Sequence, residues 1–433
     1  MQKGSVRKKG NKWYYRFRVE QPDGSWKLKE FPGTTSKRET EGMLKRAITE
    51  YEDTGAVIYA GQLTVADLCD MWYDECVEHS NRQYTTRLDV KNVIRHIKEH
   101  SLGKQTIKDI RPDILQQYVD EKYFGITADD GTEIKKGLSE SSLRSHFSVL
   151  NPMFKFAVYP KRFIRENPMQ YVQKRKKQTA SDIFLSSPED STDYINWNDF
   201  QKVVAGTENT DYQLPIQIAY YTGLRAGEIC ALTWDDIDLQ NMCVSVSKSM
   251  YYNYDTKRHE LKPTKSNKPR IVDFGDSLAN ILKDHHKRQL AHKLRYGSLY
   301  HETYYLENLV KGKVYVGLFN GLNEDIEALP MYEKLKPISF VCAKESGELF
   351  TGQTMKWVNK YVKKHVPDVP HFHMHALRHS FATNLVLNNV NFKDVQELMG
   401  HYDISITLDT YSHTTKRSRK KAVDIFNTPS LLA

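Results

Sequence analysis

A chain of 433 residues is too long for one ordinary hydrophobic core, so two or three domains are expected. Its composition, 39% hydrophobic and 27% charged residues, is typical of a soluble globular protein. The sequence contains no apolar run near the ~20 residues of a membrane span, and its basic start lacks a signal peptide's apolar stretch. The net charge of +9 favours a polyanionic partner, above all nucleic acid.

The first predicted domain, residues 1–60, begins with 50 residues that hold 13 Lys and Arg against 6 Asp and Glu. Residues 12–19 and 26–29 alternate between two faces around a Pro-Asp-Gly turn, and residues 36–54 follow as a capped helix. We predict a three-stranded sheet backed by a helix. Positive charge from the strands at residues 12–19 and 26–29 is expected on one face of this sheet. That face suits a DNA groove, and a merely solvated polar face is the alternative. The expected DNA contacts are Lys12, Tyr14, Arg16, Arg18, Lys27 and Lys29.

The second predicted domain, residues 61–173, is all-helical, with helices expected to start near residues 64, 85, 112 and 139. Basic side chains recur at helical spacing, which indicates faces that bind DNA through Lys91, Arg95 and Arg144. The helical pattern alone fits a protein-binding bundle equally well. Residues 174–193 are polar and charged and are predicted to be a linker.

Residues 194–433 are mainly helical, and an arginine stands out among apolar neighbours. Arg225 follows the apolar residues 214–221 and precedes a second apolar stretch, and an unpaired buried charge is costly. We therefore expect Arg225 to face an anion. Strand-like residues 243–251 and 270–274 flank a basic segment that we interpret as a hairpin tip, and residues 285–349 receive no role.

The last third of the chain contains further residues able to support chemistry. His375 and Arg378 lie three residues apart and share a helix face, and Arg378 too has apolar neighbours. Gly400 is typical of a helix C-cap, so we predict a turn at His401 and a short helical segment around Tyr411. Each residue alone also fits an ordinary structural role. The nearby histidines do not converge on one zinc ion from a helix, and the five scattered cysteines are expected to be reduced thiols in a cytosolic protein.

Taken together, six residues resemble the pattern of the tyrosine recombinases, the family of lambda integrase and other integrases of phages and conjugative elements. That pattern runs Arg, Lys, His-x-x-Arg, His or Trp, and Tyr in chain order. The matching positions are Arg225 in TGLRAGEI, Lys265 in PTKSNK, His375 and Arg378 in HALRH, His401 in GHYD, and Tyr411 in TLDTYSH. The resemblance covers residues 194–415 and extends more weakly to the two upstream domains.

The resemblance implies a multidomain α+β fold. A small three-stranded sheet plus helix (1–60) would bind arm sites, and an all-helical domain (61–173) would bind core sites. A linker (174–193) would lead to a mainly helical catalytic domain with a small β-sheet or hairpin and a C-terminal tail (194–433).

The implied activity is site-specific DNA recombination that integrates and excises a mobile element. Tyr411 would attack the scissile phosphate to give a 3′-phosphotyrosyl intermediate, which keeps the energy of the broken bond. Arg225 and Arg378 would hold that phosphate through bidentate bonds and stabilise the charge of its transition state. This chemistry would need no metal, cofactor or ATP.

The remaining family positions would handle protons and orientation. His375 would accept the proton of the attacking tyrosine, whose ordinary pKa of ~10 requires such help. Lys265 would donate a proton to the leaving 5′-oxygen, and His401 would hydrogen-bond a non-bridging oxygen. Glu228, one helical turn after Arg225, either orients that arginine or lies on the surface.

The partners implied are double-stranded DNA at core and arm attachment sites and three further copies of the chain, which would form a homotetramer on DNA. An excision accessory protein is a further partner that the resemblance allows, and no membrane is expected. The location would be the bacterial cytoplasm, on the nucleoid when bound to DNA. Two alternatives remain: a type IB topoisomerase-like enzyme that relaxes DNA, and a non-enzymatic DNA-binding regulator.

Overall fold

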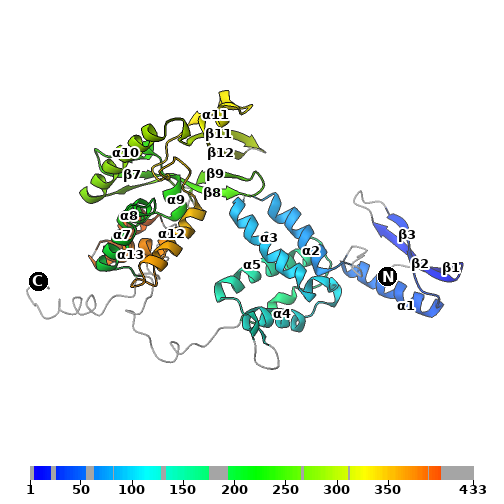
Figure 1. Ribbon diagram of the computed structural model, residues 1–433. Helices are drawn as coiled ribbons and strands as arrows, with labels where there is room; N and C mark the ends of the chain where they lie inside the picture. Colours follow the sequence, from blue (N-terminus) through cyan, green and yellow to red (C-terminus); the bar gives the residue numbers. More distant parts are fainter. Residues whose placement is uncertain are drawn as a thin grey trace, which may run out of the picture. The chain divides into compact units, whose positions relative to one another are not determined.

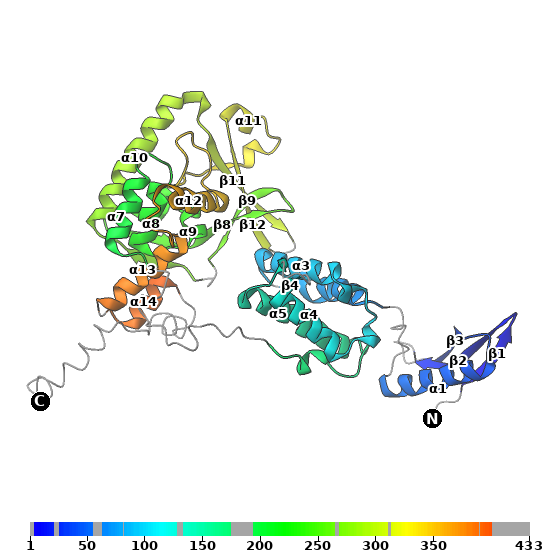
Figure 2. The same cartoon turned by 60° about the horizontal axis from the view of Figure 1, so that its bottom comes forward.

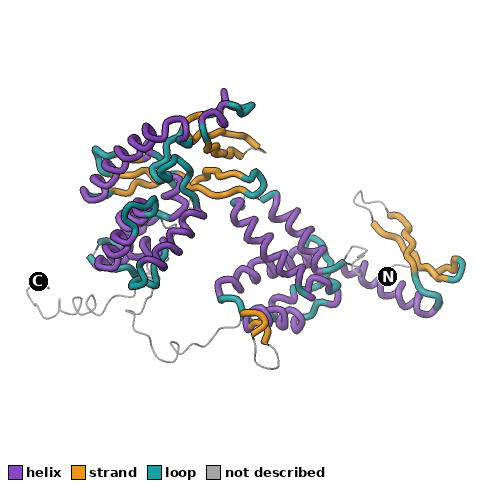
Figure 3. The backbone as a smooth tube through the Cα atoms, viewed as in Figure 1, coloured by secondary structure: helices purple, strands orange, loops and turns teal. Residues whose placement is uncertain are grey.

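The structure is a computed structural model that describes residues 4–20, 26–54, 63–80, 82–127, 133–174, 194–264, 268–310, 313–388 and 390–400. Contacts within the chain divide it into two units, Met1–Thr179 and Ala180–Ala433, and each is considered by itself (Figure 1). Helices make up most of the described backbone, with strands gathered in a few sheets (Figure 3). Within the described ranges, none of the helices has the length and apolar character needed to cross a membrane.

The N-terminal module is a three-stranded antiparallel sheet with one helix packed against it, as predicted. Its elements in chain order are β1 (Ser5–Lys9), β2 (Lys12–Glu20), β3 (Trp26–Pro32) and α1 (Lys37–Thr54). Phe17 and Val19, two residues apart on β2, point to the same side and are buried with Phe31 against Leu44 and Tyr51 of α1. This small apolar cluster leaves the opposite face of the sheet open.

Residues 63–174 form a helical body with its own core. Its elements are α2 (Val65–Trp72), η1 (Tyr73–Glu78, a π-helical turn), α3 (Tyr84–Glu99), α4 (Pro112–Phe124), α5 (Glu140–Val158) and the 3₁₀ turns η2 (Ser101–Lys104), η3 (Ile107–Asp109) and η4 (Pro168–Tyr171). Thr64 caps α2 as the sequence indicates, because its Oγ1 accepts the N–H of Asp67 at 3.2 Å while the Asp67 carboxylate accepts the N–H of Thr64 at 2.8 Å.

The all-helical prediction for this body is confirmed apart from one short ribbon, β4 (Gly125–Thr127) paired with β5 (Glu133–Lys136). Gly125 causes the difference, since its positive φ of +86° ends α4 and turns the chain into a strand.

The second unit combines helices with two sheets. Its helices are α7 (Trp197–Gly206), α8 (Gln213–Thr222), α9 (Ala226–Ala231), α10 (Asp276–Tyr296), α11 (Asn323–Glu327), α12 (Gly352–His365), α13 (Met374–Leu387) and α14 (Phe392–Met399), with 3₁₀ turns η6 (Trp234–Asp236), η7 (Gly297–Leu299) and η8 (Tyr332–Lys334). A three-stranded sheet has the order β10-β7-β6, and a five-stranded sheet has the order β13-β11-β12-β9-β8. The strands are β6 (Ile237–Asp238), β7 (Cys243–Val246), β8 (Lys248–Asn253), β9 (Arg258–Pro263), β10 (Arg270–Asp273), β11 (Glu302–Val310), β12 (Lys313–Gly321) and β13 (Lys336–Pro337).

The strand pairing in these sheets corrects the predicted hairpin around Lys265 and assigns strands to residues 285–349. The chain on either side of residues 264–269 is not a hairpin, because β9 pairs with β8 and β12 whereas β10 pairs with β7. The basic segment therefore joins two sheets. Residues 285–349, which had no predicted role, contain β11, β12 and β13, and these strands extend the sheet begun by β8 and β9.

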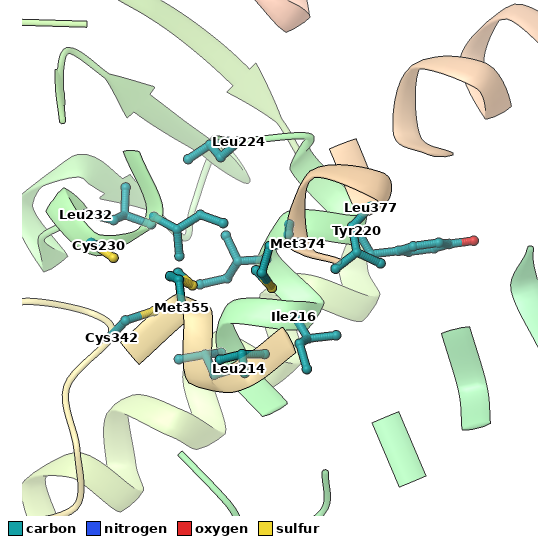
Figure 4. Close-up of a cluster of buried hydrophobic side chains, with 14 of the residues drawn as sticks. Leu214, Ile216, Tyr220, Leu224, Cys230, Leu232, Cys342, Met355, Met374 and Leu377 are labelled. Atoms are coloured by element: carbon teal, nitrogen blue, oxygen red, sulfur yellow. The ribbon is translucent and has the colours of Figure 1, made fainter. Parts of the chain in front are cut away.

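The main core of this unit lies where α8, α9, α12 and α13 meet. Side chains from these elements and their connections interlock around it, as the labelled residues in Figure 4 show: Leu214, Ile216, Tyr220, Leu224, Cys230, Leu232, Cys342, Met355, Met374 and Leu377. Helix α14 packs against the far part of α13 (Figure 2). This packing fixes the ends of α8, α13 and α14 next to one another.

Candidate active site

A tight turn between α8 and α9 positions the arginine singled out in the sequence. Gly223 ends α8 with a φ of +64°, and a Cβ there would lie 2.4 Å from the ring of Phe381, so only glycine fits. Arg225 follows as the N-cap residue of α9, with its side chain 27% exposed. The turn therefore leaves the guanidinium of Arg225 partly exposed at the start of α9.

Glu228 is the immediate partner of Arg225, which answers the question left open by the sequence. Its side chain is 2% exposed, and it accepts the backbone N–H of Arg225 and an N–H of the guanidinium, both at 2.9 Å. Both oxygens also accept N–H groups of Arg270, at 2.8 and 3.2 Å. Burial alone would raise the pKa of Glu228, but the hydrogen bonds and charges of the two arginines outweigh it and lower the pKa to about 2.

Arg378 is buried and donates to backbone carbonyls. Its side chain is 2% exposed, and its two Nη atoms donate to the carbonyl oxygens of Gly223 at 2.6 Å and Met399 at 2.5 Å. Carbonyls at the ends of α8 and α14 therefore serve as acceptors for Arg378, and its contact with an anion stays a prediction. These bonds hold Arg378 beside the turn that carries Arg225.

His375 lies one helical turn before Arg378, in the first turn of α13. Desolvation by the surrounding protein, followed by the nearby His379, Arg378, His373 and Arg225, lowers the pKa of His375 to about 4. The ring of His379 stands edge-on at 4.6 Å between centroids. His375 is consequently neutral near pH 7, the form in which a histidine can accept a proton.

The other predicted site residues, Lys265, His401 and Tyr411, lie outside the described residues. The end of α14 is described, and it agrees with the sequence: Gly400 is its C-cap, with a φ of +61°. The helix thus ends at Met399, two residues before His401 in the chain, and the carbonyl of Met399 accepts from Arg378.

The register of the N-terminal sheet corrects the predicted basic face. Residues directly opposite each other in an antiparallel pair share a face. Lys29 lies opposite the buried Phe17, and Lys27 lies opposite Val19. Lys27 and Lys29 therefore belong to the side of the sheet that packs on α1, and the statement that both strands carry charge on one face is wrong.

Positive charge on the open face comes from β1 and β2 instead. The predicted side chains of β2 that lie there are Lys12, Tyr14, Arg16 and Arg18. Arg7 and Lys9 of β1 lie on the same face and both donate to Glu30 of β3, which is opposite Arg16. Hydrogen bonds from Arg7 and Lys9 lower the pKa of Glu30 to about 2, so this carboxylate is charged on an otherwise basic face.

The basic side chains predicted on the helical body are placed on α3 and α5. Lys91 lies over the ring of Tyr73 at 5.1 Å, and Lys91 and Arg95 line one shallow surface hollow. Arg95 and Arg144 each have an acidic residue one helical turn away, at 3.9 and 4.0 Å. Pairs of this exposed kind contribute little to stability and leave both arginines accessible.

Arg270 is the residue of this site that the sequence interpretation missed. It was noted only as part of a basic segment, whereas the structure buries it against Glu228. The sequence signal that could have revealed Arg270 is Glu228, a carboxylate among apolar residues near Arg225. Arg270 and Glu228 are 42 residues apart, so no local pattern links them.

Comparison with known proteins gives a consistent result. Residues 194–418 match the phage integrase family, and residues 64–123 match the N-terminal SAM-like domain of phage integrases. A tyrosine recombinase XerC-like protein of Caldanaerobacter subterraneus subsp. tengcongensis is 26% identical over 97% of both chains. The prophage integrase IntR of Escherichia coli is 25% identical over 56% of this chain and 55% of that protein.

Among solved structures, the fold is similar to that of the Tn1549 transposon integrase in complex with transposon right end DNA. The TM-score is 0.58 at 18% identity, and the match covers 84% of this chain and all of the other. The family match spans more than half of the residues and contains Arg225, His375 and Arg378. This chain belongs to the phage integrase family.

Proposed function

We propose that this chain is a site-specific DNA recombinase that cuts and rejoins DNA strands to integrate and excise a mobile element. Membership of the phage integrase family and relatives named as tyrosine recombinases support this reaction class. The observation that carries the proposal is the joint placement of a partly exposed Arg225, a neutral His375 and an Arg378 fixed beside them.

In the proposed reaction Tyr411 attacks the scissile phosphate and becomes linked to the 3′ side of the break. The guanidinium of Arg225 turns from Glu228 towards the phosphate and binds it. Arg378, which is buried beside Arg225, stabilises the negative charge on the same phosphate. His375 accepts the proton of the tyrosine, and Lys265 gives one to the leaving 5′-oxygen. His401 completes the contacts to the phosphate.

The test is covalent trapping on a core-site duplex, identified first by selecting bound DNA from a random pool. A nick close to the cleavage point lets the released fragment diffuse away, so a recombinase accumulates as a DNA adduct on a denaturing gel. A non-enzymatic regulator gives no adduct. A topoisomerase-like enzyme relaxes supercoiled DNA without a core site and does not join two attachment sites.

The N-terminal module is proposed to bind arm sites and the helical body to bind core sites. Support comes from the basic open face of the sheet and from the basic side chains on α3 and α5. Removing residues 1–60 is therefore expected to abolish protection of arm sites while core-site cleavage stays within about threefold of the full chain, because the two bodies have separate cores. Footprinting measures the protection of arm and core sites, and denaturing gels on a core-site duplex measure cleavage. Loss of core protection with arm protection intact would contradict the assignment.

We further propose that four copies assemble on paired core sites, with the segment 422–433 docked on a neighbouring copy. Deleting residues 422–433 should keep binding to one site and reduce synapsis and recombination, because the apolar contact between copies is lost. Mass photometry with core-site DNA measures this. Normal tetramers and normal recombination by the shortened chain would remove this role from the tail.

The bacterial relatives support a cytoplasmic location, with the protein on the nucleoid when it is bound to DNA. An accessory protein for excision stays a prediction. It is testable by asking whether purified protein alone excises an integrated element.

A further inference from the structure

We infer that Arg270 is a positioning residue of the active site, which fixes Glu228, and through it Arg225, relative to the end of α14. The inference rests on the proposed function for its effect on cleavage, while its structural part stands on geometry alone. Arg270 belongs to none of the positions that the family pattern predicted here.

Arg270 uses all three nitrogens of its guanidinium. Its side chain, at the start of β10, is 8% exposed. Nη1 and Nη2 donate to the two oxygens of Glu228 at 3.2 and 2.8 Å, and Nε donates to the carbonyl oxygen of Leu398 at 2.9 Å. One rigid, planar group thus joins α9 to the last turn of α14.

The contact with α14 is also a close packing contact. A Cβ placed on Gly400 would lie 3.0 Å from Cδ of Arg270, 3.1 Å from Nη1 and 3.2 Å from Nε. The guanidinium therefore lies directly against the backbone of Gly400. Arg270 thus fixes the described end of α14.

The pairing also explains how Arg225 becomes available for a phosphate. Removing one partner of a buried carboxylate is expensive when no other partner remains. Glu228 has two arginine partners, and Arg225 is the more exposed of them, at 27% against 8%. When Arg225 turns to a phosphate, Arg270 still holds both oxygens of Glu228 and compensates its charge.

Arg270→Lys keeps the positive charge, but its single ammonium nitrogen cannot reproduce the planar fork that reaches both oxygens of Glu228 and the carbonyl of Leu398. We expect single-turnover cleavage to slow by about tenfold or more, with core-site affinity unchanged within about twofold. The matched control is Arg295→Lys, because Arg295 pairs with Glu345 in the same unit but on the exposed surface. That control should cleave at the normal rate.

A double-variant comparison separates positioning from general destabilisation. If Arg270 acts through Arg225, the variant Arg225→Lys/Arg270→Lys should be about as slow as Arg225→Lys alone. Rate losses that multiply would show that Arg270 acts independently and would overturn the inference. Glu228→Gln is the second, nearly isosteric variant, and it should show the same non-additivity with Arg225→Lys. Cleavage at the normal rate by Arg270→Lys or Glu228→Gln would also overturn it.

Hydrogen–deuterium exchange tests the structural part without DNA. The amide of Gly400 donates to the carbonyl of Glu397 at 3.0 Å in the last turn of α14. Arg270→Lys should exchange faster at residues 397–400, while Arg295→Lys should not. Unchanged exchange would overturn the inference. Absence of any DNA adduct with the unmodified chain would instead refute the proposed function and leave this exchange result standing.

Discussion

Tyr411→Phe is expected to bind core-site DNA as tightly as the unmodified chain and to form no covalent adduct. The change removes only the oxygen that attacks phosphorus, so contacts that give affinity remain. Denaturing gels on a nicked core-site duplex measure the adduct, and fluorescence anisotropy at fixed salt measures the affinity. We expect the loss of the adduct to be complete.

The matched control for this experiment is Tyr254→Phe. Tyr254 lies in the turn between β8 and β9 and is 66% exposed, so it tests whether removing any surface tyrosine oxygen matters. Its adduct should form at the normal rate. An adduct that persists in Tyr411→Phe would assign the attack to a different residue.

Arg225→Lys is expected to slow single-turnover cleavage by about 100-fold or more, since one preorganised donor to a developing charge contributes roughly 3–4 kcal/mol. Lysine presents one point charge and cannot bind two phosphate oxygens in the same plane. It can still pair with Glu228, so the fold and the affinity for core DNA should change little. Rapid-quench kinetics with excess protein measure the rate.

The Arg225→Lys variant distinguishes a phosphate-binding role of Arg225 from a purely structural one. Arg225 already has a buried carboxylate partner at 2.9 Å, so an arginine with a purely structural role is the alternative that must be excluded. In that case Arg225→Lys would lower the melting temperature and cleave at a near-normal rate once folded. That pair of results would contradict the assignment.

The local parts of this fold follow from the sequence because their causes are local. Alternating side chains indicate β2, Thr64 and Asp67 indicate the start of α2, and Gly400 indicates the end of α14. The three-residue spacing of His375 and Arg378 likewise requires only a helix. Each of these predictions depends on neighbours within one or two turns.

The parts that the sequence did not reveal depend on long-range pairing. Lys27 and Lys29 alternate as a strand should, but which face they join depends on their register with β2. Arg270 and Glu228 look unremarkable in isolation, and only the fold brings them into contact. The sequence likewise does not predict which strands pair with β9 and β10, because these partners are also set by the fold.

Identifying the protein–DNA bond itself tests most directly whether this chain cuts DNA through Tyr411. The unmodified chain is trapped on a core-site duplex, digested with protease and nuclease, and the modified peptide is sequenced by mass spectrometry. We expect one nucleotide attached through its 3′-phosphate to Tyr411, and no modification at any other tyrosine. A nucleotide on another residue, or attachment through a 5′-phosphate, would contradict it.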